Sequence, residues 1–252
     1  MSVAIVPCQS IDEVITQLDC IIAHCAQHHN RLGYFATLYR DVTRRVQFGI
    51  QRSRFEDGPR MERLDVIFAN RYFEALDCYW RHAPSPQCWT VAFQAAQRGH
   101  PTILQHLLLG MNAHINLDLA IAAIQTTPGS DLPGLKRDFY EITLLLGELI
   151  DEVQGRIDRV SPWLHVIDTI GGRTDEEICR FAITTVRDLA WHTAERLAQL
   201  PPQQLSAEIA KQDAQVAAMG QVIGWPGWPL NIAIRARERQ PVAAVIAVLK
   251  ME

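Results

Sequence analysis

The sequence predicts one all-α domain over residues 1–252, a bundle of helices around a buried central helix at about 101–125. Apolar residues recur at helical spacing along most of the chain, and no segment shows the alternation that a β-strand requires. In the segment 101–125, Asp118 is the only charged residue and apolar side chains cover all sides of a helical wheel. A helix of that kind is buried on every side, so we expect other helices to enclose it.

The helices expected before the central one span 10–29, 31–50, 59–81 and 85–98. Ser10 is a typical N-cap followed by acids, Pro59 suits a first helical position, and Ser85 precedes a further helix start. The apolar stripe of the third helix, from Met61 to Trp80, contains Asp65. An acid on an inward face needs a partner, which makes Asp65 a candidate site residue.

The helices expected after the central one span 131–157, 174–199, 205–219, 230–239 and 241–250. Asp138 lies at the margin of the apolar stripe of the first of them. The helix at 174–199 begins with a capping-box signature, and His192 falls on the face that we predict to point inward. The Trp225/Trp228 loop either covers a pocket as a lid or packs on the core. We expect the helices at 10–29, 59–81, 131–157 and 174–199 to surround the central helix.

The composition limits the possible partners and location. A formal net charge of −4 and a pI near 6.1 give no electrostatic reason to expect nucleic acid or an anionic membrane surface as a partner. The N-terminus lacks the basic start and apolar run of a secretory signal, and the six cysteines form no C-x-x-C pair. These features favour a cytoplasmic protein with reduced thiols and no membrane span.

The central helix carries polar side chains in a setting that should be buried. They are His106, Asn112, His114, Asn116 and Asp118. Burying such groups without partners costs roughly 2–7 kcal/mol each, so they must be hydrogen-bonded, paired or bound to a metal. We therefore expect the functional site to lie on this helix.

His114 and Asp118 are four residues apart and lie on one face of the helix. Such a pair suits two ligands of a divalent metal (Zn²⁺, Mn²⁺ or Fe²⁺), or a His–Asp dyad for acid/base catalysis. It also suits a structural contact in the core. Because Asp65, Asp138 and His192 are also predicted to point inward, we favour a site between helices. Facing carboxylates need a cation, for which a metal, Arg71 or a protonated histidine qualifies.

Two stretches carry a resemblance to known proteins. They are NAHINLDLA at 112–120 and LDVIFANRYFEAL at 64–76, with Asp138-Phe139 as a third element. Together they resemble an uncharacterised bacterial family whose common feature is a G-x-N-A-H-I-N-x-D-L helix. That resemblance implies an all-helical fold and a site, without an assigned reaction. The matching positions are Asp65, Arg71, His114, Asn116, Asp118, Asp138 and Trp191.

A weaker likeness is to the all-helical zinc-dependent phospholipase C and nuclease group, whose helices carry H-x-x-x-D ligands. The further ligands of that group have no clear counterparts in this chain.

The sequence thus predicts a small-molecule enzyme, either a metal-dependent hydrolase or an acid/base catalyst, with a pocket between helices. The alternative is a helical binding or scaffold protein whose polar core is only structural. The expected catalytic residues are His114, Asp118, Asp65 and Asp138, with His114 and Asp118 also as metal ligands. The expected substrate-binding residues are Asn112, Asn116, Arg71 and His192.

Overall fold

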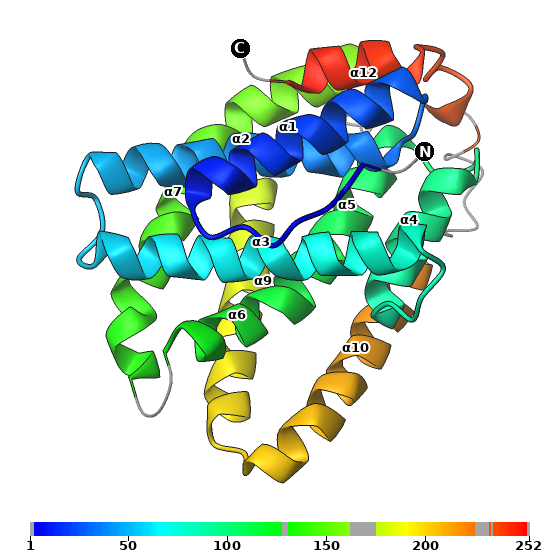
Figure 1. Ribbon diagram of the computed structural model, residues 1–252. Helices are drawn as coiled ribbons and strands as arrows, with labels where there is room; N and C mark the ends of the chain where they lie inside the picture. Colours follow the sequence, from blue (N-terminus) through cyan, green and yellow to red (C-terminus); the bar gives the residue numbers. More distant parts are fainter. Residues whose placement is uncertain (1–2, 128–130, 162–174, 225–231, 233, 251–252) are drawn as a thin grey trace.

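The computed structural model describes residues 3–127, 131–161, 175–224, 232 and 234–250, and within 175–182 the backbone alone. Every element in these residues is a helix (Figure 1), which confirms the predicted all-α class. The helices are α1 (Ile11–Gln27), α2 (Leu32–Gln51), α3 (Gly58–Trp80), α4 (Gln87–Gln97), α5 (Ile103–Ala113), the π-helix η1 (His114–Asp118), α6 (Leu119–Thr126), α7 (Leu132–Val160), α9 (Asp175–Ala198), α10 (Pro202–Gly224) and α12 (Val242–Leu249).

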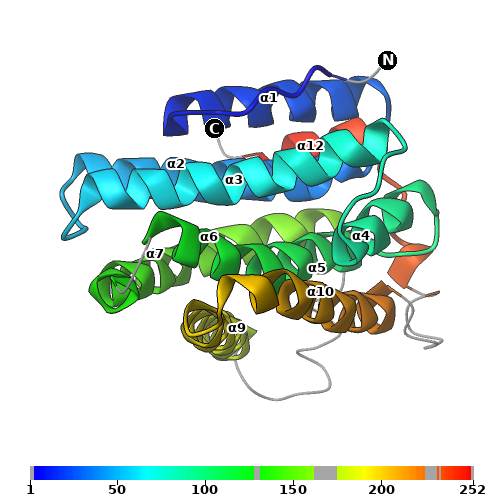
Figure 2. The same cartoon turned by 60° about the horizontal axis from the view of Figure 1, so that its bottom comes forward.

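The helices stack in layers, and Figure 2 shows their order. Helix α1 is outermost and packs on α2, α3 and α12. Helices α2, α3 and α12 form the layer below α1. The central helix lies in the layer beneath them, with α4 and α7, and α9 and α10 cover its other side. The 10–29 helix, which we predicted to help surround the central helix, packs mainly on α2, α3 and α12, and α2 lies between it and the central helix. An amphipathic stripe shows that a helix is half-buried, but it does not identify the helix that covers it.

The central helix comprises α5, η1 and α6 without a break, and most of it is buried as predicted. It begins with a capping box in which the Thr102 side chain accepts the Gln105 N–H and the Gln105 side chain accepts the Thr102 N–H. By length and hydropathy, Ile103–Thr126 is a helix that could cross a membrane. However, 72% of its most apolar stretch is buried inside the fold, as in the core helix of a globular domain.

Three buried acids each reach across the fold to the start of another helix. Asp213 of α10 accepts the N–H groups of Gln87 and Cys88 at the start of α4, at 2.7 and 2.9 Å. Glu238 accepts the Ile103 N–H at the start of α5 at 3.1 Å. Asp138 does the same for α3. Negative charge at a helix N-terminus is favourable because the first N–H groups lack partners within the helix.

The C-terminal half contains further differences from the sequence prediction. The weaker helix expected at 205–219 is longer in the structure and, as α10, covers one face of α5. The helix expected at 241–250 is present as α12. The Trp225/Trp228 loop lies outside the described residues.

Candidate functional site

The segment from His114 to Asp118 forms a single π-helical turn in the middle of the central helix. The Leu119 N–H bonds the His114 carbonyl, five residues back, so the turn is wider than in an α-helix. One of its carbonyl groups is held from outside, because the Gln212 side chain of α10 donates to the Asn116 oxygen at 3.2 Å. Single π-turns within α-helices frequently occur at functional sites. Here the turn contains both residues of the predicted pair.

The Asp118 carboxylate is buried and fully engaged. Arg71 Nε donates to Oδ1 at 2.9 Å, and Trp89 Nε1 donates to Oδ2 at 2.8 Å. The Oδ2 atom also lies 3.5 Å from His114 Nδ1, at the long limit of a hydrogen bond. Of the cations that the sequence offers to the buried acids, Arg71 is thus the one that pairs with Asp118. Trp89 was not predicted, although a buried indole N–H needs an acceptor.

The His114 ring is enclosed by aromatic side chains and is only 3% exposed. It stacks on Phe68, with centroids 3.5 Å apart, and meets the edge of Tyr39 at 4.4 Å. Burial lowers the pKa of His114 more than the neighbouring Asp118 raises it. The ring is therefore neutral at pH 7, and a proton on Nδ1 is the arrangement that suits the acceptor Asp118. Nε2 has no hydrogen-bond partner among the described residues and retains its lone pair.

His114 lines a cavity of about 250 Å³. Leucine, isoleucine, valine, methionine and phenylalanine side chains from α2, α3, the central helix, α7 and α9 form most of its wall. The side chains of Leu104, Leu107, Leu108 and Met111 continue the cavity face of the central helix toward its N-terminus. The polar lining residues are Tyr39, Asp65, His114, Gln154 and Arg187.

Asp65 of α3 lies in the wall of this cavity, as the sequence predicted for an inward acid. Its Oδ2 atom is buried, and no described residue hydrogen-bonds it. Burial raises the pKa of Asp65 to about 8, and the nearby Glu62 adds to the effect. The carboxyl is therefore mostly protonated at pH 7 and can donate a proton, whereas the Asp118 carboxylate is held by charged and N–H donors.

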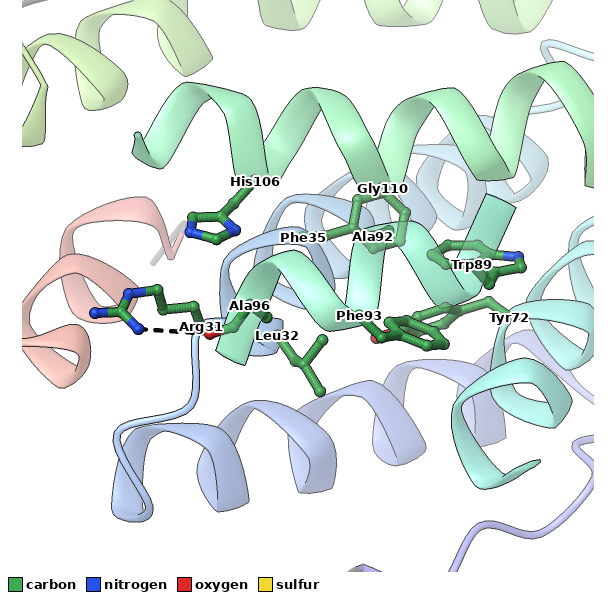
Figure 3. A pocket seen from close by; sticks show the side chains of 10 residues that line it. All are labelled: Arg31, Leu32, Phe35, Tyr72, Trp89, Ala92, Phe93, Ala96, His106 and Gly110. Carbon is green, nitrogen blue, oxygen red and sulfur yellow. Dashed lines mark hydrogen bonds between the residues drawn. The ribbon is translucent and has the colours of Figure 1, made fainter. Parts of the chain in front are cut away.

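A second, much smaller cavity of about 20 Å³ lies beside the same helix, toward its N-terminus (Figure 3). Phe35 lines both cavities, and a side chain on Gly110 would come within 2.4 Å of its ring. His106 lies at the far end of the small cavity, near Arg31. Burial and the charges of Arg31 and Arg235 lower the pKa of His106 to about 3. This space holds little more than one water molecule, so the large cavity is the candidate site.

Asp138 and His192, a predicted catalytic and a predicted binding residue, do not line the cavity. Asp138 accepts the N–H groups of Glu56 and Asp57 at 2.7 and 3.0 Å and pairs with Arg60, so it caps α3 instead. His192 has a 72% exposed side chain and contacts Glu195, so its predicted inward orientation is wrong. The buried face of this part of α9 consists of Arg187, Ala190, Trp191, Ala194 and Leu197. Large and small apolar residues on that face pack against α6 and α7, which turns His192 outward.

The predicted substrate-binding residues of the central helix face another helix. Asn112 Nδ2 donates to the Val216 carbonyl of α10 at 2.9 Å, and its Oδ1 accepts from Asn116 at 3.0 Å. Neither asparagine lines the cavity. Arg71 of α3, another predicted binding residue, does not line the cavity either, because it pairs with Asp118. Arg187, which the sequence analysis missed, is in the wall.

The residues present do not fit a metal centre. Among the described residues, no group of three or more His, Cys, Asp or Glu side chains is placed to hold a metal ion. Both Asp118 oxygens already accept hydrogen bonds, one of them from a guanidinium whose charge opposes a bound cation. In the described part of the chain, His114 and Asp118 contact each other and lack the further ligands that a metal would need.

Comparison with known proteins identifies a family without an assigned function. The chain belongs to a family of unknown function (DUF5995), whose family model matches residues 11–226. The matched region includes the central helix and every helix that lines the large cavity. None of the curated proteins or solved structures compared with the chain matches it.

Proposed function

We propose that the protein is a small-molecule enzyme in which His114 is the general acid/base, acting on an apolar substrate in the large cavity. The single observation that carries this proposal is His114 Nε2. It belongs to a neutral imidazole in the cavity wall, it has no hydrogen-bond partner in the described part of the chain, and the opposite ring nitrogen faces an anchored carboxylate. In enzymes with a catalytic histidine, a carboxylate at one ring nitrogen orients the ring in this way, and the other nitrogen transfers the proton.

Asp118 is the positioning residue of this mechanism. Arg71 and Trp89 hold its carboxylate, which keeps the His114 proton on Nδ1 and stabilises the imidazolium that forms when Nε2 takes a proton. Asp65 supplies the complementary group, a carboxyl that is protonated at pH 7 and lies in the same wall. Two ionisable groups whose surroundings move their pKa values apart are the usual acid and base of one reaction. Positioned proton transfer of this kind contributes about 10²–10⁴-fold in rate.

Two other functions are alternatives to this proposal. A metal-dependent hydrolase like the zinc-dependent phospholipase C group needs ligands beyond His114 and Asp118, and the geometry gives it less support. A binding protein without catalysis would use the same apolar cavity. Metal analysis of purified wild-type protein and of His114→Ala tests the metal-dependent hydrolase. One equivalent of metal in wild type that is lost in the variant would support it.

Occupation of the cavity is tested with tryptophan substitutions on α7. Leu146 lines the cavity, so Leu146→Trp should fill it and abolish binding of an environment-sensitive apolar fluorophore. Leu144 on the same helix is 62% exposed, so Leu144→Trp is the matched control and should bind like wild type. Equal binding by both variants would show that the fluorophore binds elsewhere, which contradicts a ligand site in this cavity.

Catalysis is tested on small molecules that copurify with the protein and are identified by mass spectrometry of an organic extract. Wild type is incubated with each molecule, and the change in its mass or hydrogen–deuterium exchange at its acidic positions is followed. His114→Gln retains a polar side chain of similar reach but no base, so we expect binding without turnover. Binding with no turnover by wild type would support the binding protein, and turnover retained in His114→Gln would exclude His114 as the acid/base.

A further inference from the structure

Arg187 is a buried cation in the wall of the large cavity. The residue is 3% exposed, and its guanidinium lies 4.4 Å above the ring centroid of Phe139. Nε donates to Thr143 Oγ1 at 2.8 Å and Nη2 donates to the Phe139 carbonyl at 2.6 Å, both on α7. No hydrogen bond from Nη1 is found among the described residues. These contacts orient the guanidinium without neutralising its charge.

No described carboxylate pairs with Arg187. Asp188 is the nearest acid in sequence and its charge raises the pKa of Arg187, but its side chain hydrogen-bonds Tyr140 and forms no ion pair with the guanidinium. Asp65, the other acid of the cavity wall, is mostly protonated at pH 7, and burial lowers the pKa of Arg187 itself to about 10. Buried ions are normally paired because removal from water is costly, and a guanidinium still carries its charge at pH 7. Among the described residues, the mostly apolar cavity therefore has in its wall one guanidinium that no carboxylate pairs with.

We propose that the ligand of this cavity is an amphiphile with a single carboxylate, which pairs with Arg187 while an apolar chain fills the rest of the space. This inference rests on the proposed function, because it names the substrate class of the same cavity. A planar carboxylate matches the N–H donors of a guanidinium. One cation in the wall matches one negative charge, whereas a phosphate ester would carry nearly two at pH 7. The aliphatic side chains that line the cavity match the apolar chain of such a ligand.

Two probes of equal chain length, dodecanoic acid and dodecanol, separate the charge from the apolar chain. Calorimetric titration at pH 7 should show wild type binding the acid about 10- to 100-fold more tightly than the alcohol, the range of one charge-assisted hydrogen-bonded contact. Arg187→Met should reduce the affinity for the acid to that for the alcohol and leave the alcohol unchanged. Arg187→Lys should retain part of the preference, since the charge remains.

The controls separate the carboxylate from the cavity. Arg196 lies on the same helix with a 44% exposed side chain, so Arg196→Met should leave both affinities unchanged. Leu146→Trp should abolish binding of both probes. Binding of neither probe by wild type would contradict the proposed function itself. Equal binding of acid and alcohol by wild type would leave the cavity in place and overturn the carboxylate assignment.

A titration with wild type alone covers the case in which Arg187→Met does not fold. The affinity for dodecanoic acid should fall to that for dodecanol as the pH falls below the pKa of the probe's carboxyl, while the affinity for the alcohol stays constant. A preference for the acid that persists when its carboxyl is protonated would overturn the pairing with Arg187.

Discussion

The two faces of the central helix are both polar and both buried, yet they differ in how completely their polar groups are paired. On the face toward α10, the side chains of Gln105 and Asn112 each donate to a backbone carbonyl of that helix, at 2.7 and 2.9 Å. A side chain on Gly220 of α10 would come within 3.4 Å of Asn112, so the two helices approach closely there. On the cavity face, His114 Nε2 and, from α3, Asp65 Oδ2 are buried without a hydrogen-bond partner among the described residues, and both residues belong to the cavity wall.

This difference indicates which buried polar residues are structural. Groups that only hold helices together satisfy their hydrogen bonds within the protein, because an unpaired buried group reduces stability. Groups that remain unpaired next to a cavity are explained by a ligand. By this criterion Asn112 and Asn116 belong to packing, and His114, Asp65 and Arg187 to the proposed site. The following substitutions test the criterion, from the largest expected effect to the smallest.

Asp118→Ala should have the largest effect on stability, because the buried Asp118 carboxylate contacts His114 of the cavity wall and accepts hydrogen bonds from two further side chains. Its loss leaves the Arg71 guanidinium and the Trp89 N–H without their acceptor. We expect the free energy of unfolding to fall by about 3–5 kcal/mol, measured by urea denaturation. Combining it with Arg71→Met should recover part of the loss, since the unpaired charge is then gone. A decrease below about 1 kcal/mol would mean that the carboxylate is not the support we describe.

The stability of the protein should depend on pH through Asp65. Its pKa in the folded state, raised by burial to about 8, exceeds that of the unfolded chain. Folding therefore favours the protonated carboxyl. Its contribution to the free energy of unfolding is complete below about pH 4 and decreases as the pH rises toward 8, by on the order of 1 kcal/mol per pH unit. Asp65→Asn should remove this slope and be the more stable protein at pH 8. An unchanged slope in the variant would contradict a buried neutral Asp65.

Gly110→Ala tests the close contact between the central helix and Phe35 that separates the two cavities. The new methyl group would meet the Phe35 ring at 2.4 Å, so one of them must move. Overpacking of this kind costs about 1–3 kcal/mol, seen as a lower midpoint of denaturation. The control is Gly155→Ala on α7, where no atom lies within 4 Å, and it should stabilise the helix by about 0.5–1 kcal/mol.

Asn112→Ala should have the smallest effect and should act on stability alone. It removes the bonds to the Val216 carbonyl and to Asn116, which we expect to cost about 1–2 kcal/mol in chemical denaturation. Binding of dodecanoic acid should stay at the wild-type level, because Asn112 does not line the cavity. Weaker binding by a folded Asn112→Ala protein would show that the two faces are not separate.

The sequence indicated part of the site for a sound physical reason. Asp65 and His114 stood out because each interrupts an apolar stripe, and both line the cavity. The same signal failed for Asp138 and Asn112, which interrupt apolar surroundings in the same manner but cap a helix or bond a neighbouring one. A polar residue on an inward face has a partner somewhere, and its own helix does not reveal which.

By itself the sequence determined the helical class and the central buried helix, because apolar periodicity is set by neighbours three and four residues apart. It also determined that the polar groups of this helix need partners. Only the tertiary structure decided the partners, the π-turn and the cavity. Arg187 illustrates the limit. In sequence it is one charge among many, and its burial, with no ion-paired carboxylate among the described residues, arises from the packing of α9 on α7. Such burial depends on residues far apart in the chain, so no local pattern encodes it.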